Sequence, residues 1–114
     1  MNLDLSLTWL SGVAFLIYGL LIIFTSHMIE EFDRYGMTKF RKLTGILEIL
    51  GGLGSLIGLK FYPIYLVSTL GLFLLMLMGV ITRLRIKDEF SKILPALSLM
   101  TINGYLFVSA ILVL

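Results

Sequence analysis

The sequence contains no cysteine and only one histidine, His27, among its 114 residues. The lack of cysteine excludes disulfides, thiol catalysis, thiolate zinc sites and iron–sulfur ligation within this chain. No Ser/His/Asp arrangement, phosphate-binding loop or dinucleotide fingerprint is present either. The sequence therefore predicts no catalytic residues, and enzymatic activity of the chain on its own is not indicated.

Charged residues are also scarce, at 14% of the chain, whereas about a quarter of a soluble domain is charged. Hydrophobic residues make up 59%, which is more apolar surface than one small soluble core could hide. Lipid can solvate this excess, so we expect the bilayer to be the main partner. No basic patch with interleaved aromatic residues suggests binding of nucleic acid.

Four apolar stretches are long enough to be membrane spans, which need about 20 residues. They cover about 5–26, 43–59, 63–82 and 95–114, and the only charged side chain within them is Glu48. The unbroken runs predict a single transmembrane domain over residues 1–114. Its fold class is an all-α, integral membrane four-helix bundle with up-down-up-down order and short loops.

The two prolines agree with these boundaries. Pro63 and Pro95 both suit the first turn of a helix, where the missing N–H costs nothing. The residue before a proline disfavours the α region, so we expect Leu94 to close the third loop.

Basic residues are concentrated in the first and third loops. These loops, residues 27–42 and 83–94, hold eight of the nine basic residues: Arg34, Lys39, Arg41, Lys42, Arg83, Arg85, Lys87 and Lys92. By the positive-inside rule both loops are cytoplasmic, and both termini are non-cytoplasmic.

Glu48 lies about five residues inside the second span, or about 7–8 Å along a helix. A carboxylate at that depth needs pairing, hydration or protonation. Helical spacing places Arg41, Gly45, Glu48 and Gly52 on roughly one face, and Arg83 has a similar depth. Two interpretations carry equal weight: an acid that lines a polar cavity, or a structural carboxylate that is tied to an arginine or hydrated.

The second span is also rich in glycine. Gly54 and Gly58 have small-xxx-small spacing, and Gly51 and Ser55 share it. This pattern favours close helix packing within the bundle. A homodimer seam through Gly51, Gly54 and Gly58, or a groove for a flat ligand, is the alternative.

Two more polar residues lie within the spans. Asn103 is near the middle of the fourth span, and Tyr18 in the first span has about the depth of Glu48. If they converge with the acid, they form a site for a quinone carbonyl or a lipid head group. The alternative is hydrogen bonding between helices. His27, Glu30 and Glu31 share a helix face but are interpreted as a solvated helix end, because a carboxylate metal site draws ligands from several helices.

Two stretches resemble a known family. The second span resembles that of the DoxX-like family, in which a basic residue leads into Gly-x-x-Glu and a run of small residues; here Arg41 or Lys42, Gly45 and Glu48 match. Residues 76–85 followed by Pro95 are similar to the family's third span, basic loop and fourth span. The resemblance implies a four-helix membrane fold and a bacterial inner membrane. Some relatives are small subunits of a thiosulfate:quinone oxidoreductase, and one distant animal relative assists receptor assembly.

Three functions are therefore considered. The first is a non-catalytic subunit or binding protein that holds a quinone, isoprenoid or lipid in a bundle cavity near Glu48 and supports a partner membrane protein or redox enzyme. The alternative is an assembly chaperone or scaffold. A small transporter is the least favoured, because the spans contain one acid and no clear repeat.

Overall fold

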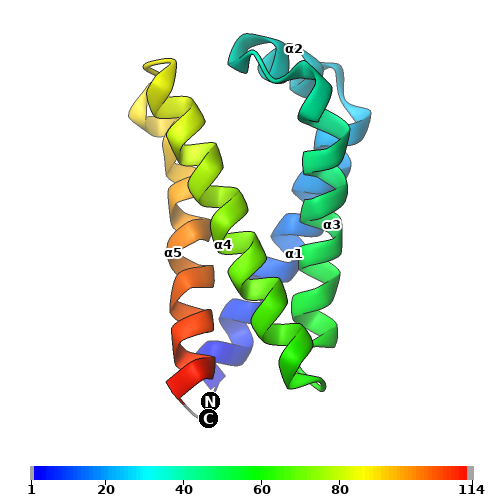
Figure 1. Cartoon of the computed structure of the whole chain (residues 1–114), viewed down its shortest axis with the longest axis vertical. Helices are drawn as coiled ribbons and strands as arrows, with labels where there is room; N and C mark the ends of the chain where they lie inside the picture. Colours follow the sequence, from blue (N-terminus) through cyan, green and yellow to red (C-terminus); the bar gives the residue numbers. More distant parts are fainter. Residues whose placement is uncertain (1, 113–114) are drawn as a thin grey trace.

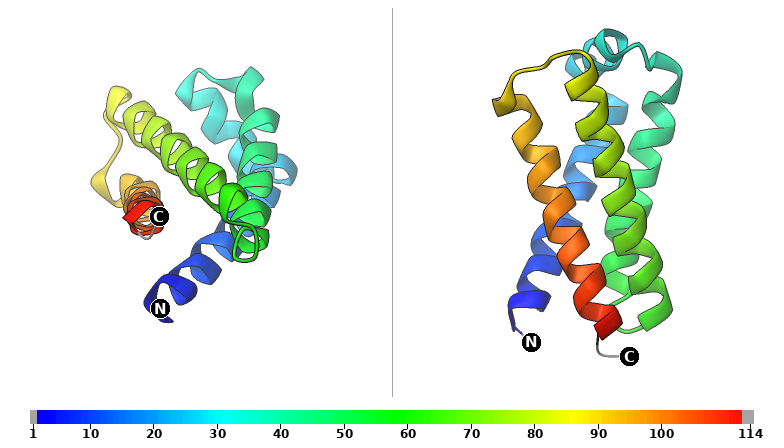
Figure 2. Two further views of the ribbon diagram at one scale, coloured as in Figure 1. Left: turned by 60° about the horizontal axis from the view of Figure 1, so that its bottom comes forward. Right: turned by 60° about the vertical axis from the view of Figure 1, so that its left-hand side comes forward.

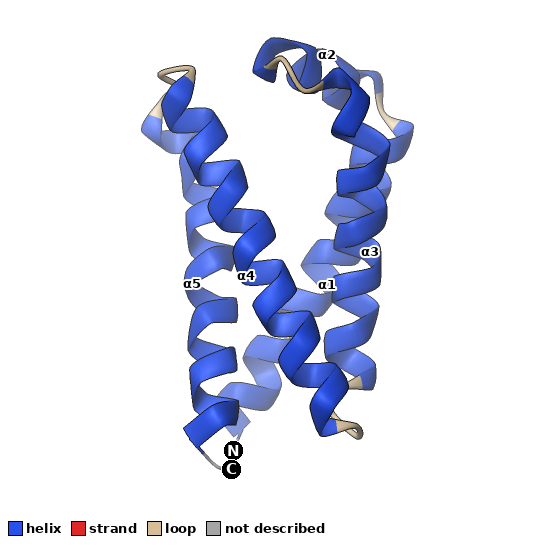
Figure 3. Cartoon of the chain, in the orientation of Figure 1, coloured by secondary structure: helices blue, strands red, loops and turns tan. Residues whose placement is uncertain are grey.

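The computed structural model describes residues 2–112, and these contain helices and loops without strands (Figure 3). The helices are α1 (Asn2–Phe24), α2 (Ser26–Tyr35), the 3₁₀ helix η1 (Thr38–Phe40), α3 (Arg41–Ile57), α4 (Tyr62–Arg85) and α5 (Phe90–Leu112). Residues 1 and 113–114, which belong to the predicted domain and its last span, lie outside the described residues. The prediction of an all-helical bundle is confirmed.

The helices α1, α3, α4 and α5 run up and down in turn, which confirms the predicted order (Figure 1). The start of α1 and the end of α5 therefore lie at one end of the bundle. The short α2 lies at the other end, as does the α4–α5 connection (Figure 2). The two basic loops thus share one end, while the cytoplasmic location of this end stays a prediction.

Three helices are long and apolar enough to cross a membrane: Leu3–Phe24, Tyr62–Arg85 and Phe90–Leu112. They identify the chain as a membrane protein. The predicted second span coincides with α3, which has 17 residues and is therefore at the lower limit of about 17–25 for a span. It packs along most of α1 (Figure 1).

The prediction of a plain loop over residues 27–42 is wrong, because most of this segment is helical. The hydroxyl of Thr25 caps α2 by accepting a hydrogen bond from the amide of Met28 at 3.4 Å. Gly36 ends α2 in the left-handed conformation, with φ of 74°, and its amide donates to the Asp33 carbonyl. Local capping chemistry thus makes a ten-residue helix from a mostly polar segment.

Pro63 lies in the first turn of α4, as predicted. The prediction that Pro95 begins the last helix is wrong: α5 starts at Phe90, and Leu94 is helical. Pro95 is the sixth residue of α5, so it costs the helix one intrahelical hydrogen bond. The amide that it removes would have bonded only the carbonyl of Ser91, near the helix end.

Glycines bring α1 and α3 into direct backbone contact. A methyl group placed on Gly52 would lie 2.8 Å from the carbonyl oxygen of Gly12, and one on Gly19 would lie 2.8 Å from that of Gly45. All four glycines are buried. Because side chains are absent at both crossing points, the two helices approach more closely than ordinary residues allow.

A second row of glycines joins α3 to α4. The contacting pairs are Gly51–Leu72, Gly54–Ser68 and Gly58–Tyr65. These contacts occupy the surface that the homodimer seam would use. Packing inside the bundle accounts for the three glycines, and a dimer draws no support from them.

We expect Gly52→Ala to lower the free energy of unfolding by about 1–3 kcal/mol, because the added methyl group meets a backbone oxygen that has no room to move. Denaturation of the purified protein in mixed micelles measures this change. Gly71→Ala in α4 is the control, since a methyl group there meets nothing within 4 Å. An equal loss of stability in both variants would contradict the close approach of α1 and α3.

Candidate functional site

Two cavities lie side by side in the half of the bundle nearest α2. The larger has a volume of about 440 Å³ and is lined by residues of all five α-helices. The smaller, of about 130 Å³, is lined by residues of α2, α3 and α4 and by Ile22 of α1. Five residues line both cavities: Ile22, Met28, Glu48, Met76 and Arg83.

The cavities follow from the way the helices pair. α1 packs on α3, and α4 packs on α5, over long interfaces, whereas α1 and α5 contact each other sparsely. The two pairs lie close together at the end that holds the start of α1 and diverge toward α2 (Figure 1). The divergence leaves space for the two cavities at the wide end, and a separate surface pocket of about 360 Å³ lies at the narrow end, lined by residues such as Asp4, Thr8 and Tyr65.

Glu48 is the polar group at the centre of this space. Its residue is 4% exposed, and it lines both cavities. Within residues 2–112 its carboxyl group has no hydrogen-bond or ion-pair partner, although hydrogen bonds and ion pairs are formed elsewhere in the bundle. A buried carboxyl group in an apolar setting is costly without a partner, so this side chain is available to a bound molecule.

Arg41, a predicted partner of the acid, is used elsewhere. Its guanidinium donates to the carbonyl oxygens of Ile22 and Ile23 at 2.7 and 2.8 Å. These carbonyls belong to the last turn of α1, where helix geometry leaves them without intrahelical partners. The cation therefore caps α1 and complements its dipole. The interpretation of Glu48 as tied to Arg41 is not supported.

Arg83, the other predicted partner, lines both cavities but binds a different acid. Its Nη1 lies 3.3 Å from Oδ2 of Asp88, and its guanidinium carbon lies 5.1 Å from the centre of the Tyr35 ring. It therefore joins α4 to α2 and does not neutralise Glu48.

Tyr18 and Glu48 do lie together, since both line the larger cavity. Tyr18 is 42% exposed and so lies at the rim rather than in the interior. The two side chains share a cavity, and their convergence on one bound molecule stays a prediction.

Asn103 does not join them. Its amide nitrogen donates to Ser11 at 2.8 Å and to the carbonyl of Leu99 at 3.0 Å, so it links α5 to α1. Its oxygen is buried and has no partner within the described chain. Gly45 and Gly52 likewise face α1 and line neither cavity, so helix packing explains these three candidates.

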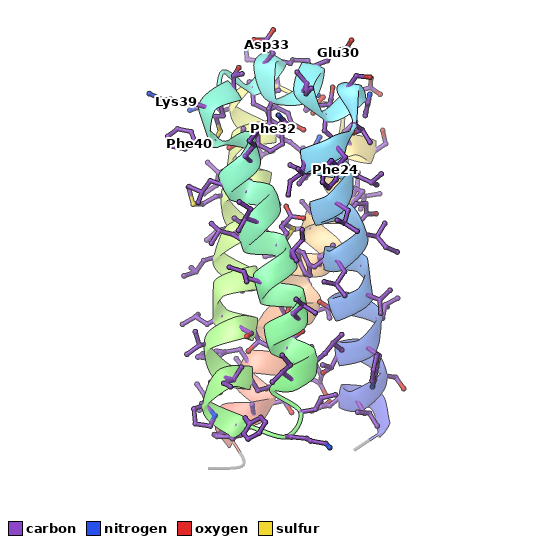
Figure 4. All side chains as sticks on the ribbon, turned by 90° about the vertical axis from the view of Figure 1, so that its right-hand side faces the viewer. Phe24, Glu30, Phe32, Asp33, Lys39 and Phe40 are labelled. Atoms are coloured by element: carbon purple, nitrogen blue, oxygen red, sulfur yellow. The ribbon has the colours of Figure 1, made fainter. Side chains whose placement is uncertain are left out.

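The contribution of α2 to the cavity wall was not predicted from the sequence. Met28, Phe32 and Tyr35 line the smaller cavity, and Met28 and His27 line the larger. Figure 4 shows Phe32 on the side of α2 that faces the bundle and Glu30 on the outer side. The sequence contains a pattern that predicts this wall, because positions 28, 32 and 35 have the spacing of one helix face.

Ion pairs hold α2 against the α4–α5 connection. Arg34 donates to Glu31 at 2.7 Å, and its two terminal nitrogens each lie 3.2 Å from a carboxylate oxygen of Asp88. These hydrogen bonds from Arg34 lower the pKa of Glu31 and of Asp88. The ion pairs therefore stabilise the fold at pH values above the usual pKa range of carboxyl groups. This stabilisation is lost as the pH falls through the lowered pKa values of Glu31 and Asp88.

A second polar cluster lies at the opposite end and was not predicted. Asp4 accepts hydrogen bonds from Tyr105 at 2.8 Å and Ser109 at 2.6 Å, which ties α1 to α5. The hydroxyl groups of Thr8 and Tyr65 lie 2.7 Å apart and join α1 to α4. These groups satisfy one another, and several of them, such as Asp4 and Thr8, line a pocket at this end.

No cluster of three or more His, Asp or Glu side chains suited to a metal ion occurs in the described part of the chain. The fold and the site define a helical membrane protein with a partly open, mostly apolar cavity, at whose wall the described residues place a buried carboxyl group without a protein partner. The model of the DoxX-like family matches residues 6–104, and the chain belongs to this family. No curated protein and no solved structure matches it.

We expect Arg41→Met to lower the free energy of unfolding by about 1.5–3 kcal/mol, because two carbonyls of α1 lose a charged donor. Denaturation in mixed micelles again measures the change. Lys42→Met removes the neighbouring charge from an exposed side chain and serves as the control, with an expected effect within about 0.5 kcal/mol. Equal stability of the two variants would show that the cap contributes nothing.

Proposed function

We propose that this protein is a non-catalytic membrane subunit or binding protein that holds a quinone, an isoprenoid or another lipid in the larger cavity. The molecule would place its polar group beside Glu48 and its apolar part among the surrounding helices. The observation that carries this proposal is the buried carboxyl group without a protein partner at the wall of an apolar cavity.

The apolar part of the ligand fits the chemistry of the wall. Most lining residues are hydrophobic, among them Leu21, Ile22, Met76 and Leu99. The volume of about 440 Å³ lies in the range of small-molecule sites, which is about 300–1,000 Å³. Such a cavity inside a membrane favours a molecule that already partitions into lipid.

The polar part of the ligand fits Glu48 and Tyr18. A phenol, or a carboxyl group in its protonated form, donates a hydrogen bond to a quinone carbonyl. An ionised carboxylate instead accepts one from the hydroxyl group of an isoprenoid alcohol or a reduced quinone. Either bond supplies the partner that the buried acid lacks in the protein itself.

The chaperone or scaffold hypothesis has less support. It relied on the glycine-rich span and Asn103 as surfaces for a client helix. In the structure the glycines contact α1 and α4, and Asn103 is buried against Ser11. Crosslinking in native membranes that traps a partner helix, together with a purified protein that holds no lipid or quinone, would favour this alternative.

Ala96→Phe tests the cavity directly, because Ala96 lines it and a phenyl ring would fill part of it. We expect quinone or lipid that co-purifies with the protein, measured by mass spectrometry, to fall at least about tenfold. Val108→Phe on the same helix is the matched control, since Val108 is 54% exposed and lines none of the described cavities near α2. Equal ligand content in both variants would rule out this cavity as the site.

Glu48→Gln separates a binding role from a structural one. We expect quinone affinity in detergent to fall about tenfold, as for the loss of one charge-assisted hydrogen bond. The stability of the ligand-free protein should stay the same or rise, because a buried ionisable group without a partner is removed. A large loss of stability with unchanged affinity would make Glu48 a structural residue.

A further inference from the structure

We propose that α2 is a lid over one end of the Glu48 cavity and that the contact between Arg34 and Asp88 is the latch that holds this lid in place. The proposal rests on the proposed function, because a lid has a purpose only where the cavity admits a molecule. It adds how access to that cavity is controlled.

The position of α2 is that of a cover. Met28, Phe32 and Tyr35 line the cavities, and all three are at least half-buried. α2 lies at the wide end, where the two helix pairs diverge (Figure 2). Its outer side carries exposed polar residues such as Glu30 and Asp33 (Figure 4). Moving α2 outward would therefore open the space beside Glu48.

Both ends of α2 have the geometry of a joint. Thr25 interrupts the helical path after α1 with an extended conformation, φ −107° and ψ 144°. Gly36 interrupts it before η1 in the left-handed region, which glycine adopts without strain. Changes of dihedral angle at these two residues can move α2 without unwinding α1 or α3, as in other hinged segments.

The latch connects the two helix pairs across the wide end. Arg34 belongs to α2, which follows α1, whereas Asp88 belongs to the α4–α5 connection. Asp88 is held in place by its own turn, because its amide donates to the carbonyl of Arg83 at 2.9 Å. Arg83 also approaches the carboxylate of Asp88, and Arg85 donates to the carbonyl of Tyr35 at 3.2 Å.

The strength of these contacts suits a lid. The Arg34 side chain is 36% exposed and that of Asp88 is 4% exposed, so the cation stays in contact with solvent and its attraction to the carboxylate is weakened by salt. Segments that open are drawn from the less stable parts of a structure. The glycine contacts of α1 with α3, by contrast, have no such polar, solvent-screened component.

A single cysteine at Met76 reports on opening, because Met76 is 9% exposed and lines both cavities. Its rate of reaction with N-ethylmaleimide is followed by mass in the purified full chain, which has no other cysteine. We expect Asp88→Asn to raise this rate at least about fivefold, since removal of the latch charge favours the open state. Added salt should accelerate labelling in the parent chain and have little effect in Asp88→Asn.

Two controls make the result specific. Glu89→Gln removes the adjacent exposed acid and should leave the rate within about twofold, as expected for a surface change. A cysteine at Ser55, which is 1% exposed and lies outside both cavities, should stay slow in the Asp88→Asn background. An unchanged rate at position 76, or an equal rise at position 55, would overturn the lid.

The labelling experiment uses no quinone or lipid, so it is independent of the binding test. If labelling accelerates as expected and the purified protein binds neither quinone nor lipid, the lid stands and the proposed function fails. If binding is found and labelling does not respond to Asp88→Asn, the lid fails and the proposed function stands.

Discussion

Close backbone contact between α1 and α3, at Gly12–Gly52 and Gly19–Gly45, is the constraint on which the rest of the bundle depends. It fixes which side of α3 faces α1, and a second row of glycines fixes the side that faces α4. The side of α3 between these two contacts faces the interior of the bundle, and Glu48 lies on this side. The glycine contacts of α3 thus determine the direction in which its one acidic side chain, Glu48, points.

Glu48 lacks a partner among the described residues because the side chains that could reach it bind other groups. The arginines with a suitable depth are committed, one to the end of α1 and the other to Asp88. The amide nitrogen of Asn103 donates to Ser11 of α1 as well. A membrane interior offers no water to replace these partners. The fold of the described residues therefore leaves a hydrogen-bonding group without a partner in an apolar space, and this is the feature on which the proposed binding of an amphiphile rests.

Much of the fold could be predicted from the sequence, because apolar length, charge position and Pro63 are local signals. The grouping of Tyr18 with Glu48 could also be predicted, since depth along a span depends on residue number alone. Which side of a helix a residue faces depends on the neighbouring helices, so the roles of Asn103 and Gly52 could not be predicted from the sequence. Arg41 was misassigned for a related reason: its acceptors exist only because α1 ends at Thr25, a break that composition does not reveal.

The seven-residue interval between the glycine contacts has a mechanical consequence. Positions seven apart return to nearly the same side of a helix, with a lag of about 20°, so both contacts persist only while the two helices stay close to antiparallel. α1 and α3 therefore behave as one stiff beam. Because α1 meets α5 over a small area, this beam is joined to the α4–α5 pair mainly through the contacts of α3 with α4, among them Gly58 with Tyr65.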